Sequence, residues 1–461
     1  MKEIVLQTLA NLREYALGKK CEIALFYHEE DSYLMRFANS AISLNTNEHL
    51  IRLDITAYAG RKRASYELIT DLGKLEEMKG AIDTAADMVN HAQPLSYEPT
   101  VPIFAETFAD EAAFDPLLAQ MNTEDRLQYF NHAVAGLESA DLKLSGIFSS
   151  GTNTIAQINT RSPHTQFYRT TDAQVSVVLA HAALKWEVQA EQSAQKMAEL
   201  APERLRHDLA FLVERYGHDT PRQIPLGAYD VVFGPAAIAE LVDTMGWIGF
   251  SGGMMKRGYS FLTDEQIGHK VFSDKVSLID DPRRLETFPF RRDFTGMNRA
   301  PFPIIEKGTF KGWTWTQDDA DEFGAKPTGH TVAHKSLVLD GGQQNVRSLK
   351  DLVTLPRERE VLYIPFLHYM NIVNPSKGII TASSRFGALL LKDDGVVTIP
   401  YNVRLTQSLL DLFGDKVAWL SQTTQPYNVS KSYGSRNPAA IIVPDFMQVD
   451  GLEISHSNTS Y

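Results

Sequence analysis

The chain has 461 residues and a formal net charge of −12, with 43% hydrophobic and 22% charged residues. These proportions are typical of a folded globular protein, and the length predicts two or three domains rather than one core. The acidic balance opposes binding to a phosphate backbone, so we expect no direct contact with nucleic acid. The densest basic cluster, residues 61–63, is interpreted as an exposed hairpin tip.

The cysteine content and the hydrophobic runs indicate in which cellular compartment the protein is expected. Cys21 is the only cysteine, which excludes an internal disulfide and a cysteine-based structural zinc site within one chain. The N-terminus lacks the basic region and apolar run of a secretory signal, and no uncharged apolar run is long enough to cross a bilayer. We therefore expect a cytoplasmic protein without membrane contact.

Residues 1–98 are predicted to form a domain of helices and antiparallel sheet. Residues 49–58 alternate between apolar and polar side chains, the pattern of a half-buried strand, and a turn at 59–63 returns the chain. Shorter strands are predicted at 22–27 and 33–37, and a helix at 72–91. An opening helix is indicated by four apolar residues at helical spacing: Val5, Leu9, Leu12 and Ala16.

A proline-rich linker precedes the second predicted region, residues 99–222. Pro94, Pro99 and Pro102 are incompatible with a continuous helix or a central strand. After them, the pattern predicts a helix from Thr123, a meander of strands, and a second helix that begins at Pro202.

Residues 223–461 are predicted to form a β-rich, barrel- or sandwich-like C-terminal domain. A strand at 229–233 and a short helix from 236 to about 246 open this region. Many short apolar runs follow, separated by glycines, prolines and acidic turns. The expected fold class for the whole chain is therefore mixed α+β.

Short motifs occur in a characteristic order from about residue 22 to 455. They are Arg36–Ser40 followed by Ile42, Ser251–Gly253, Ser260–Leu262, Ile267–Gly268, Val271–Asp274, Asp280–Pro282, Ile305–Gly308, Phe323–Gly324 and Thr328–His330. This ordered set resembles the TldD/PmbA family, whose members were once described as modulators of DNA gyrase.

The resemblance implies a zinc peptidase that acts on unfolded peptides, with the signature His-Glu-x-x-x-His and a cysteine nearer the C-terminus. Two imidazoles and a thiolate hold Zn²⁺, and the glutamate accepts a proton from the bound water. In this chain Val242 and Trp247 stand at the histidine positions and Asp243 at the glutamate position. Neither valine nor the indole nitrogen has a lone pair for a metal. We therefore expect no catalytic residue and no bound metal in this chain.

The missing ligands make the chain similar to the PmbA branch, also called TldE. That branch is implied to pair with a TldD-like subunit that carries the zinc, in proteolysis or maturation of peptides. We expect a non-catalytic subunit of this kind, without a cofactor of its own. Two alternatives stay open: a stand-alone homodimeric peptide-binding protein, and a metallopeptidase with a relocated metal site at His330, His334 or His368.

Five side chains are candidates for peptide contact: Asp243, Trp247, Trp313, Trp315 and His330. A half-buried strand accounts for the two tryptophans at 313 and 315 equally well. The acidic cluster at 318–322 is interpreted as a solvated turn. Gly252 and Gly253 are interpreted as a flexible connection, because the sequence lacks the phosphate-loop pattern.

Overall fold

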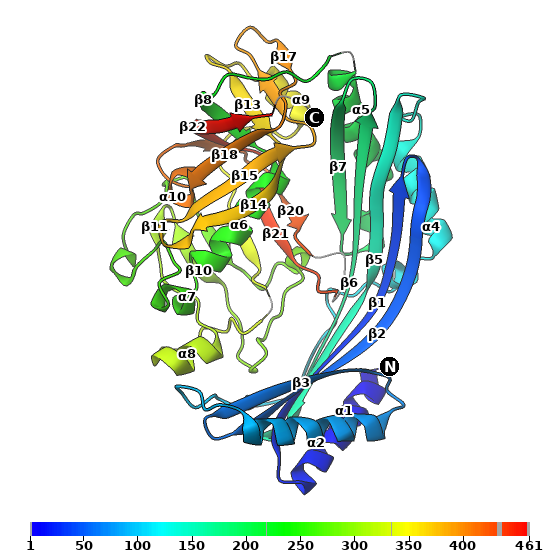
Figure 1. Cartoon of the computed structure of the whole chain (residues 1–461), viewed down its shortest axis with the longest axis vertical. Coiled ribbons are helices and arrows are strands. Elements are labelled where there is room, and N and C mark those ends of the chain that lie inside the picture. The colour runs from blue at the N-terminus through cyan, green and yellow to red at the C-terminus, as the bar shows by residue number, and fades with distance from the viewer. Residues whose placement is uncertain (1, 218, 333, 431–435, 459–461) are drawn as a thin grey trace.

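The computed structural model describes residues 2–217, 219–332, 334–430 and 436–458. A long, curved N-terminal sheet partly surrounds a β-rich C-terminal domain, which lies on the concave side of the sheet (Figure 1). This arrangement confirms the predicted mixed α+β class.

The N-terminal sheet has seven strands within the described residues, in the order β3-β2-β1-β5-β6-β4, with β7 also paired to β6. The pairs are antiparallel except that β4 runs parallel to β6. Strands that precede and follow the predicted boundary at residue 98 therefore share one sheet. The strands are β1 (Glu22–Ala38), β2 (Ala41–Ala59), β3 (Lys62–Thr70), β4 (Phe108–Asp110), β5 (Leu142–Asn159), β6 (Ser162–His181) and β7 (Trp186–Ala194).

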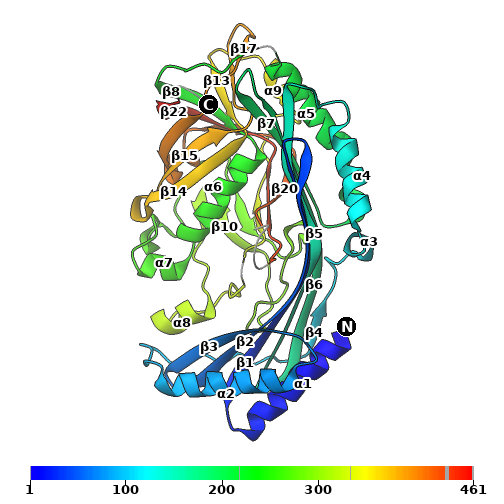
Figure 2. The same cartoon turned by 45° about the vertical axis from the view of Figure 1, so that its right-hand side comes forward.

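Helices cover the side of this sheet that faces away from the C-terminal domain (Figure 2). They include α1 (Lys2–Gly18), α2 (Leu75–His91), α3 (Pro116–Ala119) and α4 (Thr123–Val134). The helix α5 (Pro202–Tyr216) follows β7 and a short 3₁₀ turn, Met197–Glu199. The predicted apolar stripe of α1 and the alternating apolar residues of β2 are buried in one core, which confirms both patterns: Val5, Leu9, Leu12, Ala16, Ile51, Leu53, Ile55 and Ala57.

The described residues of the C-terminal domain form two further sheets. One has the order β11-β10-β9-β12-β21-β20, and the other β14-β15-β18-β22-β8-β13-β16-β17, with β19 paired to β22. The strands are β8 (Gly227–Phe233), β9 (Leu278–Asp280), β10 (Phe302–Glu306), β11 (Thr309–Phe310), β12 (Leu337–Leu339), β13 (Val361–Ile364), β14 (Phe366–Asn374), β15 (Ile379–Arg385), β16 (Leu389–Leu391), β17 (Val397–Thr398), β18 (Val403–Ser408), β19 (Val417–Leu420), β20 (Thr424–Asn428), β21 (Ala440–Pro444) and β22 (Met447–Ser457).

The helix α6 (Pro235–Ile248) packs into the main core of this domain. It begins with proline at its first position, where the missing N–H costs nothing, and it is apolar over most of its length. The other helices are short: α7 (Gly252–Lys256), α8 (Gln317–Phe323), α9 (Leu349–Thr354), α10 (Leu409–Leu412), and 3₁₀ turns at Asp264–Gln266, Leu285–Thr287 and Pro375–Lys377. No helix in the described ranges is long and apolar enough to span a bilayer.

Arg436 anchors the C-terminal domain to the concave face of the N-terminal sheet. Its guanidinium donates to both carboxylate oxygens of Asp172 at 2.7 and 2.8 Å, and to the Ser149 hydroxyl at 3.0 Å. Its backbone N–H donates to Glu30, and its carbonyl lies 3.0 Å from Nε2 of His28. The Arg436 side chain is buried.

A second contact between the two parts corrects two predictions. Residues 59–63 do form a hairpin turn, but Arg63 is half-buried and donates to Asp318 at 2.6 Å. The acidic cluster is not a solvated turn, because it forms most of α8. There Asp319 pairs with Arg257 at 2.8 Å, and Asp321 accepts from the backbone N–H of Thr100 at 2.8 Å.

Candidate functional site

The segment where the resemblance places zinc ligands lies on α6, and its two histidine positions face different environments. Val242 is 0% exposed and lies in the main core of the domain, whereas Trp247 is 62% exposed. Residues five apart on a regular helix are separated by about 140° around the axis, which explains the difference. A hydrocarbon side chain in the core and an indole at the surface do not fit a zinc ion.

Asp243 lies on the outward face of α6 with Trp247. The surrounding protein partly desolvates the carboxyl group, and this burial raises its pKa, while the nearby charge of Lys335 opposes the rise. Burial lowers the pKa of the Lys335 ammonium group, which donates to the carbonyl of Gly246 at 3.3 Å. A cation at this end of a helix stabilises the unpaired carbonyls, so Lys335 supports α6. Asp243 belongs to no group of three possible metal ligands within the described residues.

The histidines considered for a relocated metal site serve separate structural contacts. His330 is buried, and its Nε2 lies 2.9 Å from Asp280, which also accepts from Arg299 at 2.6 and 2.8 Å. His334 lies 2.9 Å from the carbonyl of Phe288, and burial lowers its pKa to about 4. His368 belongs to β14. None of the three joins a group of three possible metal ligands within the described residues.

The group that does place three such side chains together lies on the N-terminal sheet. It consists of Glu29, Asp31 and His49 of β1 and β2. The imidazole of His49 lies 2.5 Å from Asp31 through Nδ1 and 3.6 Å from Glu29 through Nε2. The hydrogen bond to Asp31 raises the pKa of His49. Since both ring nitrogens face carboxylates, these residues form an ion triad around the imidazole.

The tryptophans predicted to contact peptide differ in exposure. Trp313 is buried, and its indole N–H donates to Asp264 at 2.9 Å. Trp315 is half-buried and packs over α7. Gly252 and Gly253 do not form a flexible connection, because they open α7, where the Ser251 hydroxyl caps the N–H of Met254 at 3.3 Å.

The glycine pair is required by close packing. A Cβ atom at residue 252 would lie 2.3 Å from the Trp315 ring, and one at residue 253 would lie 2.2 Å from the Asp319 carboxyl group.

We expect Gly252→Ala to lower the free energy of unfolding by about 1–3 kcal/mol, the usual cost of overpacking. Gly80→Ala in α2 is the matched control, because a Cβ there meets no atom within 4 Å. It is expected to stabilise the protein by about 0.5–1 kcal/mol. Urea unfolding measures both, and equal stability of Gly252→Ala and the wild type would contradict the packing argument.

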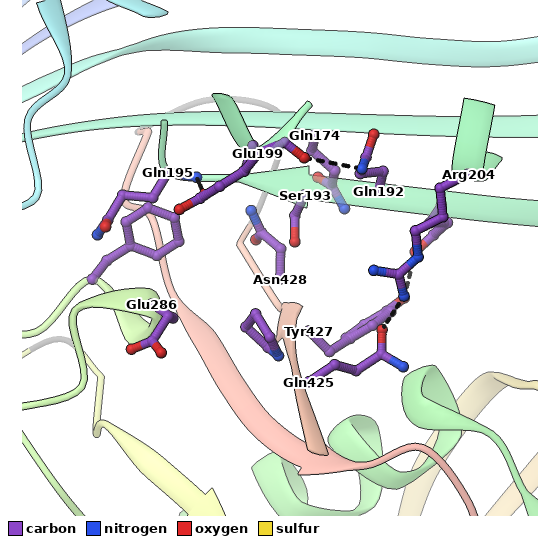
Figure 3. A pocket seen from close by; sticks show the side chains of 14 residues that line it. Gln174, Gln192, Ser193, Gln195, Glu199, Arg204, Glu286, Gln425, Tyr427 and Asn428 are labelled. Carbon is purple, nitrogen blue, oxygen red and sulfur yellow. Dashed lines mark hydrogen bonds between the residues drawn. The ribbon is translucent and has the colours of Figure 1, made fainter. Parts of the chain in front are cut away.

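Two cavities lie between the N-terminal sheet and the C-terminal domain. The first, the β7–β20 cavity, has a volume of about 350 Å³ (Figure 3). Its lining comprises Gln174, Glu191, Gln192, Ser193, Ala194, Gln195, Glu199, Arg204, Glu286, Phe288, Gln425, Pro426, Tyr427 and Asn428. The second, of about 420 Å³, extends toward α5, α9 and the start of α6. Glu191, Arg204, Gln425 and Tyr427 line both.

None of the five side chains predicted to contact peptide lines either cavity. The cavity walls come from β7 and β20, which are more than 200 residues apart in the chain. Sequence reasoning missed them because no local pattern marks such a pair. The amide side chains in and just after β7 are the one available signal, since Gln189, Gln192 and Gln195 stand close together.

The C-terminal domain, which contains helix α6 in its main core, has a metallopeptidase-like fold. The chain belongs to the PmbA/TldD family: the family model for the PmbA/TldA metallopeptidase C-terminal domain matches residues 226–456. A comparison with curated proteins gave no match.

Solved structures share the fold over nearly the whole chain. TldE from Thermococcus kodakarensis is similar with a TM-score of 0.79 at 18% identity, covering 97% of this chain and 100% of that one. A proposed modulator of DNA gyrase from Bacteroides thetaiotaomicron has a TM-score of 0.75 at 15% identity, covering 97% and 98%. Another from Thermotoga maritima has a TM-score of 0.73 at 14% identity, covering 97% and 99%. At these identities the likeness concerns the fold.

Proposed function

We propose that this chain is the non-catalytic subunit of a TldD/TldE-type metallopeptidase complex that acts on unfolded peptides. The observation that carries the proposal is the state of α6, where a buried valine and an exposed tryptophan occupy the histidine positions. The cysteine that would complete the ligand set is also missing, because Cys21 is the only one in the chain. In this proposal, zinc and the hydrolytic step belong to a TldD-like partner.

In this complex, the role of this chain would be to hold the peptide. The β7–β20 cavity supports this proposed role. Both β7 and β20 are edge strands, each paired on one side only within the described residues. An extended peptide can add to such an edge through main-chain hydrogen bonds, which do not depend on its sequence. Amide side chains in the cavity lining, such as those of Gln192 and Asn428, are of a type that both donates to and accepts from peptide groups. This chemistry suits substrates of varied sequence.

Purification of the chain from its native cells tests the partnership. We expect a second family member with an intact His-Glu-x-x-x-His segment to co-purify at equal stoichiometry. The proposal places this complex in the cytoplasm, in keeping with the single cysteine. Isolation of the chain as a homodimer that binds peptides, with no such partner in repeated preparations, would contradict the proposal and favour the stand-alone alternative.

A further inference from the structure

Glu191 is a carboxylate without a cation in the wall shared by the two cavities. It accepts hydrogen bonds from the Tyr427 hydroxyl at 2.6 Å and from the Gln189 amide. Within the described residues it forms no ion pair, although Arg204 lines the same cavities and donates instead to Gln425 at 3.2 Å. A carboxylate removed from water without a counter-charge is costly, so a cation supplied by a ligand would be favourable here.

Two further carboxylates, those of Glu199 and Glu286, also line the β7–β20 cavity. Glu199 accepts from the backbone N–H of Gln195 at 2.7 Å, and Glu286 is half-exposed and 3.4 Å from Arg284. The lining therefore contains three carboxylates, Glu191, Glu199 and Glu286, against one guanidinium, that of Arg204. Such an excess attracts cationic groups and repels acidic ones.

Asn428 adds a donor for which the described part of the chain provides no acceptor. Its side chain is 4% exposed and lines the cavity, where Figure 3 shows it among Gln195, Ser193 and Tyr427. The amide oxygen accepts from the backbone N–H of Ser430 at 2.7 Å, but the amide nitrogen has no hydrogen-bond partner among the described residues. A buried donor of this kind is normally satisfied, and a peptide carbonyl is a suitable acceptor.

We propose that the β7–β20 cavity selects peptides by a lysine or arginine side chain, whose cationic head pairs with Glu191 while a nearby peptide carbonyl accepts from the Asn428 amide. The aromatic rings of Tyr427 and Phe288 in the wall provide apolar surface for the methylene groups of such a side chain. This inference rests on the proposed peptide-holding function and adds a substrate preference to it.

Fluorescence anisotropy with a short unstructured peptide tests the preference. The peptide carries one central lysine, and its comparison peptide carries norleucine, which keeps the chain length and removes the charge. We expect the purified full chain to bind the lysine peptide at least about tenfold more tightly, as one charge-assisted hydrogen bond requires. Equal affinities would overturn the inference and leave peptide holding intact. Binding of neither peptide would overturn both.

Two variants locate the preference. Glu191→Gln keeps the hydrogen-bonding shape and should reduce the ratio of the two affinities to near one while norleucine-peptide binding is retained. Glu187→Gln is the matched control on the same strand, because Glu187 lines neither cavity and lies 3.6 Å from Arg385. It should leave the ratio unchanged. An undiminished lysine preference in Glu191→Gln would overturn the assignment, as would its loss in Glu187→Gln.

Discussion

Replacing Arg436 by methionine is expected to lower the free energy of unfolding by about 3–5 kcal/mol, because the change removes one partner of a buried ion pair. Asp172 loses a guanidinium that contacts both of its oxygens, and Ser149 loses a donor. Both acceptors lie on the N-terminal sheet, so the change weakens the anchor between the sheet and the C-terminal domain. Urea unfolding followed by circular dichroism measures the loss.

Arg206→Met is the control for this prediction, because Arg206 pairs with Glu203 at 3.3 Å and both side chains are exposed, at 45% and 60%. Exposed pairs contribute about 0–1 kcal/mol, so this variant should unfold nearly as the wild type does.

Burial raises the pKa of Asp172, and Arg436 opposes that rise. Without the arginine, the pKa of Asp172 in the folded protein moves further above its value in the unfolded chain. The stability lost by the variant is therefore regained as the pH falls through the folded-state pKa of Asp172, because the carboxyl group then becomes neutral. A deficit that does not shrink on acidification would contradict an unpaired carboxylate as its cause.

Asp280→Asn is expected to cost a similar amount, about 3–5 kcal/mol at neutral pH. The carboxylate and the guanidinium of Arg299 are both 1% exposed, and His330 and the backbone N–H of Ser336 also meet this carboxylate. The asparagine amide leaves the guanidinium buried without a counter-charge. Urea unfolding measures this cost as a lower midpoint concentration of urea. Glu306→Gln is the control, because Glu306 forms an exposed ion pair with Lys311.

The pH dependence of this cost has a definite sign. Burial alone would raise the pKa of Asp280, but the hydrogen bond from His330 and the charge of Arg299 outweigh it and hold the pKa well below its usual range. Burial lowers the pKa of His330, which favours a neutral imidazole that donates to Asp280. A depressed carboxyl pKa stabilises the fold above the unfolded value of about 3.9 and loses this effect as the pH falls toward the folded value. The difference between wild type and Asp280→Asn should therefore narrow below about pH 4, and a constant difference would contradict the ion pair.

Local periodicity predicts the parts of the fold whose partners are close in sequence. The apolar stripe of α1 and the alternation in β2 are both confirmed, because each segment buries one face in the same small core. By contrast, two short strands were predicted at 22–27 and 33–37, where the structure has the single long strand β1. The polar run His28–Ser32 breaks the alternation.

That polar run stays in the strand because distant residues satisfy it. Glu30 accepts from the backbone N–H of Arg436, and the carbonyl of Arg436 lies 3.0 Å from Nε2 of His28. The contact to Arg436 spans more than 400 residues, so no pattern within the strand could indicate it. The same limit applies to the β7–β20 cavity, whose walls come together only in the folded chain. The prediction that residues 242–247 hold no zinc needs no knowledge of the fold, because the capacity of a side chain to bind a metal depends on its residue type.

Zinc content and peptidase activity of the purified full chain show whether α6 can hold a catalytic metal. After incubation with zinc and removal of the excess, we expect far less than one tightly bound zinc per chain and no hydrolysis of an unfolded peptide. The contradictory result is one zinc per chain with turnover, both lost in Asp243→Asn, which would place a working metal site on α6.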